Sequence, residues 1–552
     1  MTTLQYSLYI LLALYILRKI QIRLRLSMAK HPSLTGHSKM SRRVAKIVPT
    51  YHIEEDKFFC SDNAPDNIKE KRKAGFDKIA AHFSTTMEKS IAAGEQLENN
   101  VSDVDFTQAY RVPFQFSPFI KDKIKFATIV TQTRSNQVKD LDGNWTYDLS
   151  GSYGVNLFGY EFYKKCMQEG HEMVKSLGPV LGSYHPVIVE NTEFLKNISG
   201  LDEVSYHMSG TEAVMQAVRL ARYHTGKSHL VRFCGAYHGW WDGVQPGVGN
   251  QRNNDDIYTL KEMDKDTLKV LKTRKDIACV LINPLQAMHP NINPPSDAML
   301  IASSRQAGFD KQAYIDWLQE LREVCTERGI VLIMDEIFVG FRLAYKGAQE
   351  YFKVKADMVT YGKTLGGGLP IGVVCGKHHL MKRYREDRPT HICFARGTFN
   401  SHPLVMACMN RFLHAIQDEA IQSQYKDIDL FWNNRVAQLN DKLAKHELPI
   451  KFVNIISVWT ILFTVPSRYN WMFQFYLRAQ GLTISWIGSG RLIISHDFND
   501  EDYAIVMEKI VSAAENMKQD GWWWQGDNMS NNSIKRQIAR ELITCVIKRS
   551  RP

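Results

Sequence analysis

The sequence lacks the patterns typical of disulfide-rich, zinc-binding and repeat proteins. Its nine cysteines are scattered and none forms a CxxC pair, so neither a metal site nor a disulfide framework is indicated. A reducing environment such as the cytosol fits this cysteine usage. With 44% hydrophobic and 23% charged residues over 552 positions, the chain has the composition of a globular protein with two or three domains.

Acidic residues are absent from the first 50 positions, which hold nine lysines and arginines. Residues 526–552 hold six basic and two acidic residues, so the two ends together carry +13, while the whole chain carries +11. The body between them is therefore close to neutral, which argues against a nucleic-acid-binding face. Basic ends beside apolar stretches are typical of chains that meet an anionic membrane surface.

The N-terminus also lacks a basic region ahead of its apolar run and a small-residue cleavage site, so a removable signal peptide is not indicated. The run from Leu4 to Leu17 is uncharged and comes close to the roughly 17 residues of a membrane span, with Arg18 directly after it. We therefore expect residues 1–26 to form a single membrane anchor, with the body in the cytoplasm by the positive-inside rule. The alternative is a hydrophobic helix docked on the body or on a partner.

Residues 526–552 are predicted to form a basic amphipathic tail. Ile534, Ile538, Leu542 and Val546 recur at a spacing of four, beside lysines and arginines. Such a helix lies in a membrane interface or docks on the protein's own body, and the sequence leaves both alternatives open.

The segment SGTEAVMQAVRLARYHTG predicts a helix with a ligand-binding start. Ser209 and Glu212 form a capping box, and Gly226 ends the helix. Gly210 allows a ligand to approach the backbone closely, and Thr211 adds a hydroxyl. Because the first turn of a helix leaves N–H groups unpaired at the positive end of the dipole, it suits a phosphate or a carboxylate. Most capping boxes bind nothing, so further groups are needed to establish a site.

Two charged groups are predicted at strand ends. Residues 330–334 are uniformly apolar and predict a buried parallel strand, with Asp335 and Glu336 at its carboxyl end. Open α/β sheets bind ligands at that edge. Lys363 comes 28 residues after Asp335, at the end of what we predict to be the next strand, before three glycines. Each residue alone is also compatible with a structural role.

A phosphate cradle, a buried acid and a buried amine together match the requirements of pyridoxal phosphate. Its phosphate suits a helix N-terminus, and its ring nitrogen stays protonated beside a carboxylate. Its aldehyde reacts with a lysine.

At this point the chain resembles the class III aminotransferases of the pyridoxal-phosphate fold type I superfamily, within their glutamate-1-semialdehyde aminomutase-like branch. The resemblance covers roughly residues 100 to 525. Its blocks follow the family's order: LDGNWTYDLSGSYGVNLFGY, LGPVLGSYHP, HMSGTEAVMQAVRLAR, FCGAYHGWWDG, MDEIFVGFR, YGKTLGGGLPIG and ARGTFNSHPL.

The resemblance implies two catalytic residues. Lys363 would bind the cofactor's aldehyde and move the proton between Cα and C4′, and Asp335 would pair with the pyridine N1–H. Thr398 would bind the phosphate of the neighbouring subunit's cofactor, which implies a homodimer with shared sites.

The resemblance also implies the residues that surround the cofactor. Gly210 and Thr211 would hold the phosphate, with Ser209 capping the same turn. Tyr237 would stack on one face of the ring and Ile337 on the other.

Substrate recognition is less clearly marked. Arg491 lies where many class III enzymes keep an arginine for the substrate carboxylate, Arg342 is a rival for a similar role, and Tyr153 is a candidate for the pocket wall. Ala287 and Met288 stand where the family often has Gly and Asn. This departure disfavours isomerisation of glutamate-1-semialdehyde and makes that edge of the site more apolar.

The fold implied by the resemblance is α/β, with a large domain built on a mainly parallel seven-stranded sheet and a smaller α+β domain. The expected division is an anchor at 1–26, a helical extension at 27–99 with no assignable role, small-domain segments at 100–165 and 406–525, the large domain at 166–405, and the tail at 526–552.

The expected activity is transfer of an amino group from an amino acid donor to an aldehyde or ketone acceptor. The anchor and the apolar pocket edge suggest a hydrophobic acceptor, such as a carbonyl of secondary metabolism. A 2,1-aminomutase and a membrane-tethered scaffold without catalysis are the alternatives.

Overall fold

The computed structural model describes residues 3–32, 37–245, 248–252, 255–291, 302–485 and 490–549. The chain divides into two compact units. Unit 1 comprises residues 1–45, 166–293 and 310–422, and unit 2 comprises residues 46–165, 294–309 and 423–552.

Unit 1 is built on a seven-stranded sheet with the order β4-β10-β9-β8-β7-β5-β6. The strand β10 runs antiparallel to both of its neighbours and the other pairs are parallel. The predicted mainly parallel sheet is therefore confirmed. The strands are β4 (Glu203–His207), β5 (His229–Phe233), β6 (Ile257–Leu260), β7 (Ile277–Ile282), β8 (Val331–Asp335), β9 (Met358–Gly362) and β10 (Gly372–Gly376).

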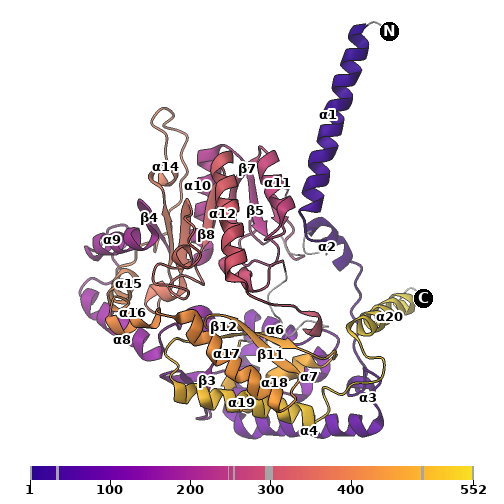
Figure 1. Ribbon diagram of the computed structural model, residues 1–552. Helices are drawn as coiled ribbons and strands as arrows, with labels where there is room; N and C mark the ends of the chain where they lie inside the picture. Colours follow the sequence, from indigo (N-terminus) through magenta and orange to yellow (C-terminus); the bar gives the residue numbers. More distant parts are fainter. Residues whose placement is uncertain are drawn as a thin grey trace. The chain divides into compact units, whose positions relative to one another are not determined.

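Helices flank this sheet (Figure 1). The central strands β7, β8 and β9 are buried along their whole length, as uniformly apolar strands covered on both faces should be. The helices of unit 1 are α1 (Thr3–Met28), α2 (Ser38–Ala45), α9 (Val187–Ser199), α10 (Gly210–Thr225), α11 (Lys265–Thr273), α12 (Lys311–Arg328), α13 (Ala348–Tyr351), α14 (His378–Met381) and α15 (Pro403–Ala415). The helices α8 (Tyr160–Val174) and α16 (Glu419–Gln424) span the boundaries between the units.

The predicted membrane anchor is wrong. Within the described part of the chain, no helix combines the length and the apolar character that crossing a membrane requires. The uncharged part of α1 ends at Leu17 and is diluted by Gln5, Ser7 and tyrosines, so it falls short of the roughly 17 apolar residues of a span. This finding contradicts both the predicted transmembrane helix and the localisation deduced from it.

Unit 2 contains two smaller sheets, ordered β1-β2-β3-β13 and β11-β12-β14. Their strands are β1 (Val130–Arg134), β2 (Gln137–Asp140), β3 (Trp145–Asp148), β13 (Leu482–Thr483), β11 (Ile450–Ile455), β12 (Val458–Phe463) and β14 (Arg491–Ile493). The helices are α3 (Glu55–Phe58), α4 (Asp66–Thr86), α5 (Glu88–Asn100), α6 (Ser102–Ala109), α7 (Ser117–Lys123), α17 (Ile428–Lys445), α18 (Phe473–Ala479), α19 (Asp500–Gln519) and α20 (Asn531–Arg549).

The C-terminal helix α20 docks on unit 2 through the first half of its apolar stripe. Ile534 and Ile538 are buried, whereas Val546 is exposed. Beside them the carboxylate of Glu541 pairs with Arg468 at 2.6 Å. The sequence left open whether this tail lies in a membrane interface or docks on the protein's own body. The first turns of α20 dock on the body.

Candidate active site

The helix α10 begins with the predicted capping box. Ser209 is the N-cap, and its hydroxyl accepts a hydrogen bond from the backbone N–H of Glu212 at 3.2 Å. The Glu212 carboxylate accepts in turn from the N–H of Met208 at 2.8 Å. Gly226 ends the helix with a left-handed φ of 65°. Because the first turn of a helix leaves N–H groups without partners inside the helix, the start of α10 suits an anion.

Glycines allow the chain to pack closely around this turn. A Cβ at Gly210 would lie 2.7 Å from the side chain of Ile337, and a Cβ at Gly239 would lie 2.5 Å from the hydroxyl of Thr211. Gly239 also has a φ of 89°, which favours glycine. The predicted cradle residues Gly210 and Thr211 thus lie against the loop that follows β5 and against Ile337 after β8.

Asp335 lies at the carboxyl end of β8 and is only 3% exposed. Its strand pairs in parallel with β9, and Asp335 stands opposite Thr360. One carboxylate oxygen accepts from the backbone N–H of Ile337 at 3.2 Å and from the Thr360 hydroxyl at 3.3 Å. The acid is therefore held in a fixed orientation by its own strand and its neighbour.

The second oxygen of Asp335 accepts a hydrogen bond from Nδ1 of His238 at 2.7 Å. Both side chains are buried. Burial lowers the pKa of His238 below its ordinary value, against the opposing effect of the hydrogen bond to Asp335. A neutral imidazole at pH 7 orients the carboxylate without cancelling its charge. Sequence reasoning missed His238, although its place directly after Tyr237 was a signal available in the motif.

Lys363 directly follows β9 and starts a short 3-10 helix, Lys363–Gly366. Its backbone has a φ of 49°, a left-handed conformation that costs on the order of 1 kcal/mol for a non-glycine residue. Burial lowers the pKa of its amine to about 8, with the Asp335 carboxylate opposing the shift and Arg342 adding to it. The predicted acid and amine therefore end neighbouring strands of one sheet, close enough for their charges to interact.

The loop that carries Tyr237 is held by side chains from the turn after β7 and from β5. Asn283 donates to the carbonyl of Tyr237 at 3.0 Å, and Gln286 donates to the carbonyl of Gly235 at 2.5 Å. Arg232, buried at the end of β5, donates to the carbonyl of Ala236 at 2.5 Å. Tyr237 itself is 59% exposed, so its ring is open to a ligand.

The other predicted side chains differ in their surroundings. Arg342 is 1% exposed and lies 5.7 Å from the ring centre of Phe338, the ring that the amine of Lys363 approaches to 5.2 Å. Thr398 is exposed, in a loop of unit 1. Met288, expected at the pocket edge, is fully buried.

Two of the predicted substrate-binding residues belong to unit 2. Tyr153 is 48% exposed and has a φ of 57° in the turn Gly151–Gly154. Arg491 begins β14, where burial lowers the pKa of its guanidinium to about 10, with Arg305 adding to the shift. The structure describes them within their own unit only.

These features fit a pyridoxal-phosphate site of the aminotransferase type. The glycine-lined helix start matches the cofactor's phosphate, the buried Asp335 matches its ring nitrogen, and the desolvated amine of Lys363 matches its aldehyde. In addition, Nε2 of His238 is buried and has no hydrogen-bond partner among the described residues.

Comparison with known proteins defines the family. Residues 120–514 match aminotransferase class III, and the chain belongs to this family of pyridoxal-phosphate-dependent transaminases. Curated relatives include glutamate-1-semialdehyde 2,1-aminomutases. That of Methanocaldococcus jannaschii is 30% identical over 351 residues, covering 60% of this chain and 75% of the relative. That of Alkaliphilus oremlandii is 30% identical over 407 residues, covering 68% and 88%.

Solved structures show the same fold. A β-phenylalanine aminotransferase from Variovorax paradoxus aligns with a TM-score of 0.65 at 19% identity, covering 81% of this chain and 98% of that one. A glutamate-1-semialdehyde aminomutase from Pseudomonas aeruginosa PAO1 aligns with a TM-score of 0.65 at 17% identity, covering 81% and 99%.

Proposed function

We propose that the protein transfers an amino group from an amino acid donor to an aldehyde or ketone acceptor in two half-reactions. The observation that carries the proposal is the desolvated amine of Lys363 at the end of β9, beside Asp335 at the end of β8. A scaffold without catalysis has no need for this pair, because keeping an amine at a pKa of about 8 costs folding free energy.

Each residue has a distinct task in this proposal. When bound, pyridoxal phosphate supplies an aldehyde for the amino group and an electron-accepting ring. The first turn of α10, with Ser209, Gly210 and Thr211, holds the phosphate. Asp335 accepts the hydrogen bond from the ring N1–H, and Tyr237 and Ile337 cover the two faces of the ring.

Lys363 is the proposed base. An amine with a pKa of about 8 has an appreciable neutral fraction at physiological pH, so it can take the proton from the substrate Cα and return it at C4′. His238 orients Asp335 through their 2.7 Å hydrogen bond and keeps it ready for the ring nitrogen. Thr398 is proposed to reach the phosphate of a neighbouring subunit in a homodimer. Light scattering of the purified protein tests whether this homodimer forms.

A 2,1-aminomutase is the second candidate, and the curated relatives at 30% identity favour it. The residues Ala287 and Met288 argue against it, because they replace the Gly-Asn pair common in this family. The expected hydrophobic acceptor loses its support, because no helix in the described part of the chain could cross a membrane and Met288 is fully buried.

The test is the absorption spectrum of the purified protein as amino acids are added one at a time. The lysine-bound cofactor absorbs near ~420 nm, and a true donor bleaches this band. Transamination predicts bleaching by at least one amino acid, with recovery on adding an aldehyde or ketone. Turnover of glutamate-1-semialdehyde without any second substrate would instead establish the aminomutase. A Lys363→Ala variant that binds the cofactor but shows neither reaction supports the assigned role of this lysine.

A further inference from the structure

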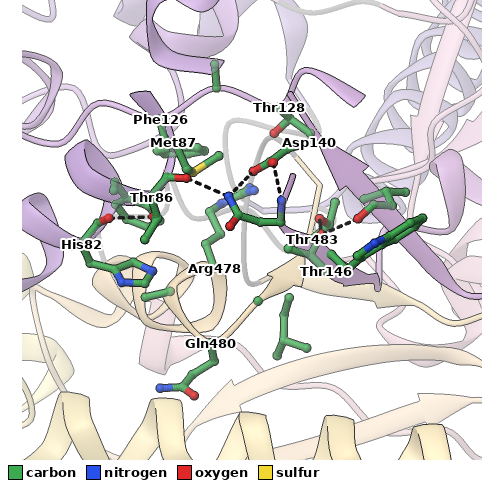
Figure 2. A pocket seen from close by; sticks show the side chains of 18 of the residues that line it. His82, Thr86, Met87, Phe126, Thr128, Asp140, Thr146, Arg478, Gln480 and Thr483 are labelled. Carbon is green, nitrogen blue, oxygen red and sulfur yellow. Dashed lines mark hydrogen bonds between the residues drawn. The ribbon is translucent and has the colours of Figure 1, made fainter. Parts of the chain in front are cut away.

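Unit 2 contains a cavity of about 280 Å³ that the proposed reaction does not use (Figure 2). Its walls come from the end of α4, the sheet β1-β2-β3-β13, the turn after α18 and one side chain of α19. All of these residues belong to unit 2, so the cavity is complete within that unit.

One wall lies outside the part of the chain that matches the family. Phe83, Thr86 and Met87 precede residue 120, where the family match begins. Asn144, in the turn between β2 and β3, donates to the carbonyl of Thr86 at 2.7 Å. The carboxylate of Asp142 accepts from the backbone N–H groups of Lys89 and Ser90, in the first turn of α5, at 2.8 and 2.9 Å. These bonds fasten the N-terminal extension to the sheet, and the extension contributes His82, Phe83, Thr86 and Met87 to the lining of the cavity.

The cavity has a cationic side. The ammonium of Lys509 donates to the backbone carbonyl of Gln480 at 2.6 Å, and burial lowers the pKa of this lysine. Arg478 adds a second positive charge, with its guanidinium 4.8 Å from the ring centre of Phe126. Among the described lining residues the one carboxylate is Asp140, and both its oxygens accept hydrogen bonds from Asn144.

A neighbouring cavity of unit 2, of about 170 Å³, shows the contrast. It is also lined by lysines, but Lys125 pairs with Glu95 at 2.5 Å and Lys121 pairs with Glu98. A lysine paired with a carboxylate needs no ligand. In the larger cavity the ammonium of Lys509 faces a carbonyl, which carries only a partial charge, so an anion there gains a charge-assisted hydrogen bond.

The rest of the lining is apolar or carries hydroxyls. The rings of Phe83 and Phe126 pack with their centres 5.4 Å apart and form an aromatic wall. The hydroxyls of Thr146 and Thr483 lie 2.6 Å apart and face the same space (Figure 2). Pockets that combine an aromatic wall with a few placed polar groups are typical of small-molecule sites.

We propose that this cavity binds a small carboxylate with an aromatic or apolar body, its carboxylate held by Lys509 and Arg478 and its body against Phe83 and Phe126. The cavity shares no residue with the lysine, the acid and the helix start of unit 1. It therefore stands or falls independently of the proposed amino transfer.

The test is isothermal titration calorimetry of the full-length protein, with cofactor bound, using 3-phenylpropionate as the probe. We expect saturable binding in the micromolar to millimolar range, with the visible band of the cofactor unchanged. The uncharged 3-phenylpropionamide has nearly the same size and should bind about tenfold or more weakly, because it lacks the charge that Lys509 recognises.

Variants locate the site. Lys509→Met should weaken binding of 3-phenylpropionate about tenfold or more, and Thr483→Val should weaken it severalfold. Lys518→Met is the matched control, since Lys518 lies on the same helix and also donates to backbone carbonyls, those of residues 446 and 447, but does not line the cavity. Absence of saturable binding, equal binding of acid and amide, or unchanged binding in both cavity variants would each overturn the proposal.

Discussion

Replacing Lys363 by methionine should stabilise the cofactor-free protein, although it removes the proposed catalytic base. Burial holds the pKa of this amine at about 8, whereas an unfolded chain leaves it near 10.5. The folded state therefore binds this proton less tightly than the unfolded state. The difference corresponds to roughly 3 kcal/mol at neutral pH, because one pKa unit is worth about 1.36 kcal/mol. Methionine has a similar length and carries no charge to desolvate.

The sign of the effect fixes its dependence on pH. At pH 7 and below, the amine is mostly protonated in both states, so nearly the full penalty is present in the folded state. Between pH 8 and 10.5 the folded state has released the proton and the unfolded state has not, so the stability of the wild-type protein rises with pH. The advantage of Lys363→Met should therefore be largest at pH 7 and should disappear by about pH 10.5.

Thermal unfolding of cofactor-free protein across this pH range measures the effect. We expect the midpoint of the variant to exceed that of the wild type by roughly 5 °C at pH 7 and to approach it at high pH. Lys353→Met is the matched control, because Lys353 also has a left-handed φ, 54°, but its side chain is exposed. An equal midpoint difference at every pH, or destabilisation at pH 7, would refute the desolvation argument.

Two further substitutions test the close packing around the proposed phosphate site and the buried ion pair of the N-terminal extension. Gly210→Ala places a methyl group 2.7 Å from Ile337 and should weaken cofactor binding about tenfold or more in a spectroscopic titration, whereas Gly308→Ala, with open space around it, should not. Arg72→Met removes one partner of a fully buried ion pair and should destabilise unit 2 by about 3–5 kcal/mol in denaturant unfolding. Removal of the ion pair between Lys57 and Glu54, both of which are exposed, should leave the stability of unit 2 nearly unchanged. Equal effects of the two removals would contradict the assigned burial.

Local patterns predicted the parts of the site that depend on neighbours in sequence. The capping box joins Ser209 and Glu212, which are three positions apart in a single helix turn, and the structure forms it. The apolar run before Asp335 needs only a buried strand, and β8 is buried throughout. Both are short-range consequences of backbone geometry, so they can be read directly along the chain.

Contacts across the sheet could not be predicted in this way. His238 meets Asp335 across 97 residues of sequence, and Asn283 meets the carbonyl of Tyr237 across 46. Each contact depends on which strands become neighbours, and the order β8-β7-β5 is a property of the whole sheet. The N-terminal extension in unit 2 had no predicted role for the same reason. Its buried ion pair between Arg72 and Asp62 forms only when the surrounding segments pack together.

The adjacent acids Asp335 and Glu336 show most clearly what local sequence patterns cannot predict. Both are carboxylic acids at the end of the same strand, so residue type alone makes them equivalent candidates. Their side chains leave the end of β8 in different directions and meet different partners. Asp335 forms a hydrogen bond with His238, and its charge interacts with the amine of Lys363. Glu336 instead accepts hydrogen bonds from the backbone N–H groups of residues 348 and 349, at 2.6 and 3.2 Å, and so caps the start of α13. Burial raises the pKa of Glu336 to about 8. A group that is mostly protonated at neutral pH and engaged with a helix start offers no steady negative charge to a ring nitrogen. The choice of Asp335 as the proposed partner of the ring nitrogen thus follows from the contacts of the two acids rather than from residue type.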